Sequence, residues 1–121
     1  RRQRQMCIRD MAELLVLAKK KENIIPCLCD AHFPEKYRVQ ANNPEIIYQD
    51  IAQNDQVDIF IRNCEYYKPK HAFLMLKTQS MAKQRDDIFN MTEKRLNKIF
   101  KKVESININK WAKGHSAYYV E

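Results

Sequence analysis

Hydrophobic positions near the N-terminus recur every three or four residues. In the segment 6–21, the apolar side chains Met11, Leu14 and Ala18 fall on one face of a helix. The basic run Lys19–Lys21 follows them, where positive charge suits the negative end of a helix dipole. We therefore expect a helix over residues 6–21.

The central part of the chain carries shorter and less regular patterns. We expect one turn of helix within 27–33 and a short strand over 37–41. A further helix is predicted over 43–53, because Asn43 can cap it and Pro44 suits its first turn.

Three further segments are expected to be helical. Segment 56–62 fits both an alternating strand and a helical face, and the shortage of glycine turns favours the helix. Pro69 is expected to open a helix over 70–85. A helix over 92–104 carries one apolar stripe that includes Leu96 and Val103, with lysines on its other side.

The tail changes period. Ile106 and Ile108 alternate with polar residues, the only glycine of the chain is Gly114, and a second β-rich run follows at 118–120. Alternation, a short loop with glycine and a second run predict a β-hairpin over 105–121.

Together the elements predict one domain over residues 1–121, of an α-dominant α+β class with four to five helices and a C-terminal β-hairpin. Residues 1–5 are expected to form a flexible basic arm. Because the chain begins at Arg1 without methionine, we expect a domain excised from a longer protein. Helix 70–85, helix 92–104 and the hairpin, in that order, resemble the distal half of a winged-helix domain. The resemblance implies a second helix that reads the major groove of nucleic acid and a hairpin that contacts its backbone.

Charge supports a polyanionic partner. The net charge is +7, and the basic side chains gather before residue 22 and after residue 66, on either side of an acidic middle segment. We expect a non-catalytic nucleic-acid-binding domain that contacts phosphates with little sequence preference, in the nucleus rather than the cytoplasm, with DNA and RNA both left open. The expected interface consists of Lys94, Arg95, Lys98, Lys101, Lys102, Lys110, Trp111, Lys113 and His115.

A protein-interaction role within a larger complex is the alternative. Tyr66, Tyr67 and Tyr118 would then serve as rigid aromatic anchors, a role in which tyrosine is enriched at interfaces. An adaptor or scaffold domain of this kind would depend on its aromatic side chains more than on its lysines.

No cofactor, metal, membrane segment or enzymatic activity is predicted. The single glycine leaves no phosphate-binding loop, and no apolar run approaches the ~20 residues of a membrane helix. Cys27, Cys29, His32 and Cys64 could supply zinc ligands, but one residue between the first two cysteines does not match the usual spacing. Packing as small apolar groups is the preferred interpretation of the cysteines.

Overall fold

The computed structural model describes residues 2–78 and 85–121. The chain forms two compact units, Arg1–Asn42 and Asn43–Glu121. Within the described residues, none of the helices is both long enough and apolar enough to cross a membrane.

The first unit is helical. Helix α1 spans Arg2–Lys20, the 3-10 helix η1 spans Pro34–Tyr37 and the short helix α2 spans Arg38–Ala41. The predicted N-terminal helix is confirmed. The predicted strand over 37–41 is wrong, because most of it lies in α2, and residues 27–33 contain a turn but no helix.

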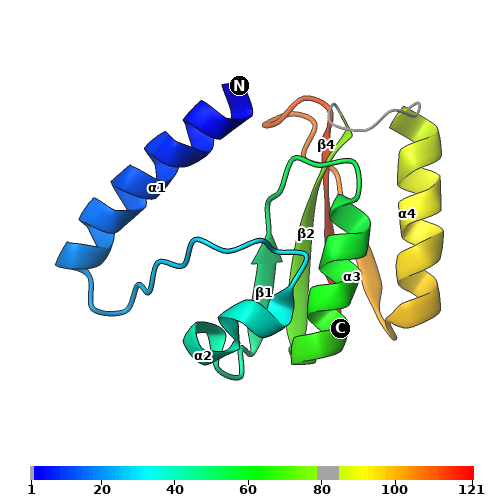
Figure 1. The fold of residues 1–121 in the computed structure, drawn as a ribbon. Coiled ribbons are helices and arrows are strands. Elements are labelled where there is room, and N and C mark those ends of the chain that lie inside the picture. Colours follow the sequence, from blue (N-terminus) through cyan, green and yellow to red (C-terminus); the bar gives the residue numbers. More distant parts are fainter. Residues whose placement is uncertain (1, 79–84) are drawn as a thin grey trace. The chain divides into compact units, whose positions relative to one another are not determined.

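The second unit contains a mixed four-stranded sheet (Figure 1). Its strands are β1 (Ile46–Gln49), β2 (His71–Lys77), β3 (Val103–Ile106) and β4 (His115–Val120), in the order β1-β2-β4-β3. β1 pairs with β2 in parallel, whereas β4 pairs antiparallel with both β2 and β3.

Two helices cover one face of this sheet. Helix α3 spans Gln56–Tyr67 and helix α4 spans Arg85–Ile99. Alternate side chains of β2 point toward these helices, as expected for a period of two residues. The resulting core contains Val57, Phe60, Ile61, Cys64, Ala72, Leu74, Leu76, Ile88, Leu96, Tyr118 and Val120.

The other face of the sheet leaves large side chains accessible. On β1, Ile46 is 58% exposed and Tyr48 is 63% exposed, and on β3 Ile106 is 45% exposed. Phe73 and Tyr119 lie on the same face, with ring centroids 5.1 Å apart.

Two predicted helices are strands instead. In the predicted helix over 43–53, residues 46–49 form β1, and in the predicted helix over 70–85, residues 71–77 form β2. Pro69 does not open a helix, because it follows Lys68, whose left-handed conformation (φ 48°, ψ 56°) ends α3. Residues 79–84 of the second prediction lie outside the described residues.

Two other predictions stand in altered form. Segment 56–62 is helical, as predicted, and belongs to the longer helix α3. The helix predicted over 92–104 begins earlier, at Arg85, and ends at Ile99, because Val103 starts β3.

The winged-helix assignment is wrong, although the two C-terminal strands do pair. β4 is an inner strand that pairs with β2 along its whole length, so the pair is not a free wing. The element expected as the first helix of the pair, over 70–85, supplies a central strand of the sheet.

Gly114 occupies a conformation that suits glycine. Its φ is 77°, in the left-handed region where a Cβ atom is unfavourable. Its N–H donates to Asn109 Oδ1 at 3.1 Å, and its carbonyl accepts from Thr78 Oγ1 at 2.7 Å. The loop between β3 and β4 is thereby fastened to the end of β2.

Replacing Gly114 with alanine should lower the free energy of unfolding by about 1–2 kcal/mol, because alanine resists the left-handed conformation. Urea denaturation measures the loss, with Lys113→Ala, at the exposed neighbouring position, as the control. Equal stability of the two variants would show that the loop does not require this backbone conformation.

Candidate functional site

The carboxyl ends of the parallel strands β1 and β2 carry an ion pair. Asp50 directly follows β1 and Lys77 is the last residue of β2. The Lys77 Nζ atom lies 2.7 Å from Asp50 Oδ1, and the two side chains are 26% and 46% exposed. In open sheets with parallel strands, ligands bind beyond the carboxyl ends of the strands. This edge is therefore the candidate reaction site.

The side chain of Gln56 fixes the backbone of Lys77. Gln56 is fully buried at the start of α3. Its Oε1 accepts from the Lys77 N–H at 2.9 Å, and its Nε2 donates to the Lys77 carbonyl at 3.0 Å. Gln49 Nε2 in turn donates to the Gln56 carbonyl at 2.7 Å. These hydrogen bonds join the end of β1, the start of α3 and the end of β2, next to the residues of the ion pair.

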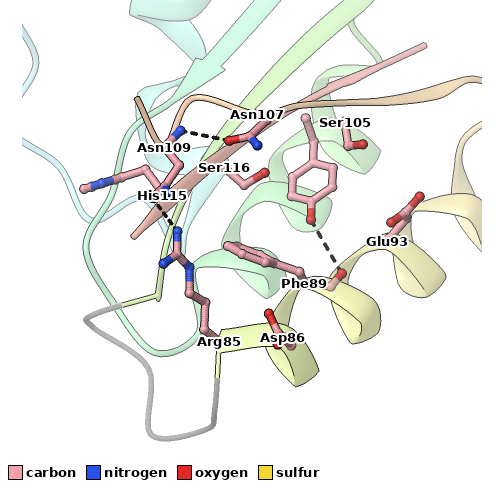
Figure 2. A pocket seen from close by; sticks show the side chains of 10 residues that line it. Arg85, Asp86, Phe89, Glu93, Ser105, Asn107, Asn109, His115 and Ser116 are labelled. Atoms are coloured by element: carbon pink, nitrogen blue, oxygen red, sulfur yellow. Dashed lines mark hydrogen bonds between the residues drawn. The ribbon is translucent and has the colours of Figure 1, made fainter. Parts of the chain in front are cut away.

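A pocket opens at the same edge of the sheet, between α4 and the strands β3 and β4 (Figure 2). Its volume is about 370 Å³. It is lined by Arg85, Asp86, Phe89, Glu93, Ser105, Asn107, Asn109, His115, Ser116 and Tyr118. His115 is the register partner of Lys77, so the pocket begins one strand away from the ion pair.

Hydrogen bonds hold the lining of this pocket in place. Arg85 Nη2 donates to Asn109 Oδ1 at 2.5 Å, which links the start of α4 to the loop before β4. The Asn109 N–H donates to Asn107 Oδ1 at 3.0 Å. The Tyr118 hydroxyl donates to the Phe89 carbonyl at 3.5 Å.

The predicted lysine ridge is only partly one surface. Lys94, Arg95 and Lys98 lie exposed on α4, whereas Lys101 and Lys102 follow the end of that helix. Two of these residues already have carboxylate partners. Arg95 Nη2 lies 2.6 Å from Asp58 Oδ1, and Lys102 Nζ lies 3.4 Å from Glu104 Oε1.

The other predicted interface residues lie in the loop before β4 or at its start. Trp111 is 78% exposed, and the Lys110 Nζ atom lies 5.7 Å from the centre of its ring. His115 Nδ1 lies 3.0 Å from the Lys113 carbonyl, and its side chain reaches the pocket. Of the predicted interface residues, His115 alone lines this pocket.

The weak zinc candidates occur in separate groups. Cys27 Sγ lies 3.0 Å from Cys29 Sγ, and His32 Nδ1 lies 2.6 Å from Asp30 Oδ1. Cys64 belongs to the core of the second unit, where burial raises the pKa of its thiol to about 12. In the part of the chain that the structure describes, no three His, Cys, Asp or Glu side chains form a metal-binding group.

The aromatic anchors of the alternative prediction differ in exposure. Tyr66 is 42% exposed, and its ring meets that of Tyr67 edge-on, with centroids 4.9 Å apart. Tyr118 is only 2% exposed, because it faces the core. Tyr118 therefore cannot anchor a partner at the surface.

Asp50, Lys77 and Gln56 are absent from the sequence-based candidates. Asp50 comes two residues after the short apolar run 46–48 and Lys77 directly follows the run 72–76, which is the arrangement that parallel strands give to polar residues at a site. That signal can be read only when both runs are known to be strands, whereas their local patterns predict helices.

Comparisons with known proteins agree on one family. The fibrillarin family profile matches residues 5–121. The chain is 32% identical over 116 residues to the fibrillarin-like rRNA/tRNA 2'-O-methyltransferase of Pyrococcus abyssi, covering 93% of this chain and 51% of that protein.

Solved structures give the same result. The structure of a fibrillarin/Nop5p complex matches with a TM-score of 0.84 and 29% identity, covering 93% of this chain and 56% of that chain. Aeropyrum pernix fibrillarin, in complex with natively bound S-adenosyl-L-methionine, matches with a TM-score of 0.73 and 25% identity, covering 93% and 51%. The chain thus spans about half the length of these relatives.

These findings overturn three predictions. The fold is similar to that of fibrillarins and not to that of a winged helix. A non-catalytic domain is the wrong functional class, because the relatives are named as methyltransferases and one of them holds a methyl donor. Of the two nucleic acids that the sequence left open, DNA binding is overturned, since the relatives' names specify rRNA and tRNA.

Replacing Gln56 with methionine should reduce the free energy of unfolding by about 2–4 kcal/mol, because the backbone N–H and carbonyl of Lys77 lose their partners inside the protein. Thermal and urea denaturation measure the effect. Gln40→Met, at an exposed position of α2, is the matched control and should change stability little. A loss of the same small size in both variants would refute the role of Gln56.

Proposed function

The chain belongs to the fibrillarin family, and we propose that it carries the catalytic pair, Asp50 and Lys77, of an RNA 2'-O-methyltransferase. The carrying observation is the 2.7 Å ion pair at the carboxyl ends of two parallel strands. The names of the relatives support the reaction class and the RNA substrate. This chain spans about half the length of those relatives.

The pair suits transfer of a methyl group to a ribose hydroxyl. The reaction joins the 2'-oxygen to the methyl carbon, breaks the carbon–sulfur bond of the donor, and releases the hydroxyl proton. The Asp50 carboxylate is positioned to accept that proton as a general base. The Lys77 ammonium group holds Asp50 in place and stabilises negative charge that develops on the 2'-oxygen.

The same edge fits a cationic cofactor. S-adenosyl-L-methionine, when bound, supplies a methyl group activated by a positively charged sulfur. The Asp50 carboxylate is paired with Lys77 but is still 46% exposed, so a bound donor could approach it. The described residues thus supply the catalytic side of a cofactor site.

Replacing Lys77 with alanine, or Asp50 with asparagine, should lower the rate of RNA methylation by about 100-fold or more, because each change removes an interaction made in the transition state. Transfer of tritiated methyl groups from S-adenosyl-L-methionine to RNA, in the full-length protein, measures the rate. Lys70→Ala removes one exposed positive charge at the opposite end of β2 and should leave the rate nearly unchanged. Near-normal rates in both site variants would refute the proposed function.

We propose further that Lys94, Lys98 and Lys101 contact RNA phosphates. All three are exposed, and within residues 2–78 and 85–121 none has a recorded carboxylate partner. Arg95 and Lys102 contribute less, because Asp58 and Glu104 already balance their charges. Phosphate contacts of this kind give affinity without sequence preference.

Reversing the charge of Lys94 and Lys98 together should weaken RNA binding and flatten its salt dependence by about two phosphate contacts. Fluorescence anisotropy with a labelled RNA, at several salt concentrations, measures both. Reversal of Arg95 and Lys102 serves as the control and should have the smaller effect. A wild-type salt slope in the Lys94 and Lys98 variant would exclude this surface.

A further inference from the structure

We propose that the pocket between α4 and the β3–β4 segment is a subsite for one nucleoside of the RNA, next to the nucleotide whose ribose is methylated. This inference rests on the proposed function, because it takes the RNA to be bound at the Asp50 and Lys77 edge. It adds a second point of contact that fixes which ribose reaches that edge.

The position of the pocket supports this role. His115 lines the pocket and pairs in register with Lys77, so the backbones of these two residues lie one strand spacing, about 5 Å, apart. Thr78, the residue after Lys77, donates both its N–H and its hydroxyl to the Gly114 carbonyl. The catalytic edge and the pocket wall are therefore parts of one hydrogen-bonded structure.

The size and lining of the pocket suit a nucleoside. Its volume of about 370 Å³ falls at the lower end of the roughly 300–1,000 Å³ found for small-ligand sites. Amide groups of Asn107 and Asn109 and hydroxyl groups of Ser105 and Ser116 line it. These groups donate and accept hydrogen bonds, as the edges of bases require.

An aromatic platform is also present. Phe89 lines the pocket, and the Arg85 guanidinium lies 5.6 Å from the centre of its ring. Guanidinium planes and aromatic rings are the surfaces on which proteins stack unpaired bases. Figure 2 shows Arg85 and Phe89 on the α4 side of the pocket, facing the asparagine side chains of the loop.

The charge of the lining selects between parts of a nucleotide. Arg85 and His115 are accompanied by the carboxylates of Asp86 and Glu93. Two carboxylates disfavour a phosphate group inside the pocket, but they accept hydrogen bonds from ribose hydroxyls and base amino groups. The phosphates remain outside, near the exposed side chains of Lys110 and Lys113 on the adjoining loop.

The proposal is tested by adding a diribonucleotide to the isotope-labelled chain and following backbone amide signals by NMR. Saturable shifts are expected at Asn107, Asn109 and Ser116. Ser105→Phe should weaken binding about tenfold or more, because the new ring fills the pocket. Ile106→Phe adds the same ring to the same strand on the opposite face, and its binding should match the wild type.

Three outcomes decide the matter. Equal binding by Ser105→Phe and Ile106→Phe would overturn the subsite, while the assignment of Asp50 and Lys77 would stand. Equal binding of the dinucleotide with the same bases and 2'-deoxyribose in place of ribose would also overturn it, since the carboxylates are proposed to accept hydrogen bonds from ribose hydroxyls. Retained binding in Lys77→Ala supports a separate subsite. A failure of the proposed function is recognised separately, because Lys77→Ala would then methylate RNA normally.

Discussion

The parallel pairing of β1 with β2 is the constraint on which the site depends. It brings the ends of two short strands to one edge of the sheet, so that Asp50 and Lys77 meet although α3 separates them in sequence. The Gln56 side chain then occupies the place of an additional strand residue beside Lys77, with bonds to both of its backbone groups. Because buried hydrogen-bond partners are costly to lose, this arrangement fixes the backbone from which the Lys77 side chain extends toward Asp50.

The sequence predicts α1 and the C-terminal strand pair because each has a clear local pattern, whereas α3 fits two patterns and is predicted as a helix because the chain has a single glycine. β1 and β2 lack a clear pattern: their apolar runs are short, and parallel strands buried in a sheet do not need alternation of apolar and polar residues. Asn43 and Pro44 are also acceptable ahead of a strand, and Pro69 follows a helix end at Lys68. Both segments form strands because they pair with each other and β2 also pairs with β4. Pairing between segments that are distant in sequence cannot be read from a local pattern.

The candidate site was missed for the same physical reason. A charged residue is informative when its place at the end of a strand is known, and neither Asp50 nor Lys77 was placed there. The lysines of α4 were predicted as interface residues because the positive charges of an amphipathic helix can be read directly from the sequence. His115 was selected for its charge, whereas the structure gives it a place in the pocket wall, in register with Lys77. Arg85, Phe89 and Asn109 required the fold to bring α4 and the loop together.

The outer position of β1 in the sheet has a consequence for handling the protein. β1 is hydrogen-bonded to β2 along one side and forms the end of the strand order. Among the described residues of Asn43–Glu121, no strand pairs with its other side, which lies next to the accessible side chains of Ile46 and Tyr48. Such a border is a template for adding a further strand, from the same molecule or from another copy. A lysine in place of Ile46 would put a charge on this border, which is one way in which natural sheets prevent such pairing.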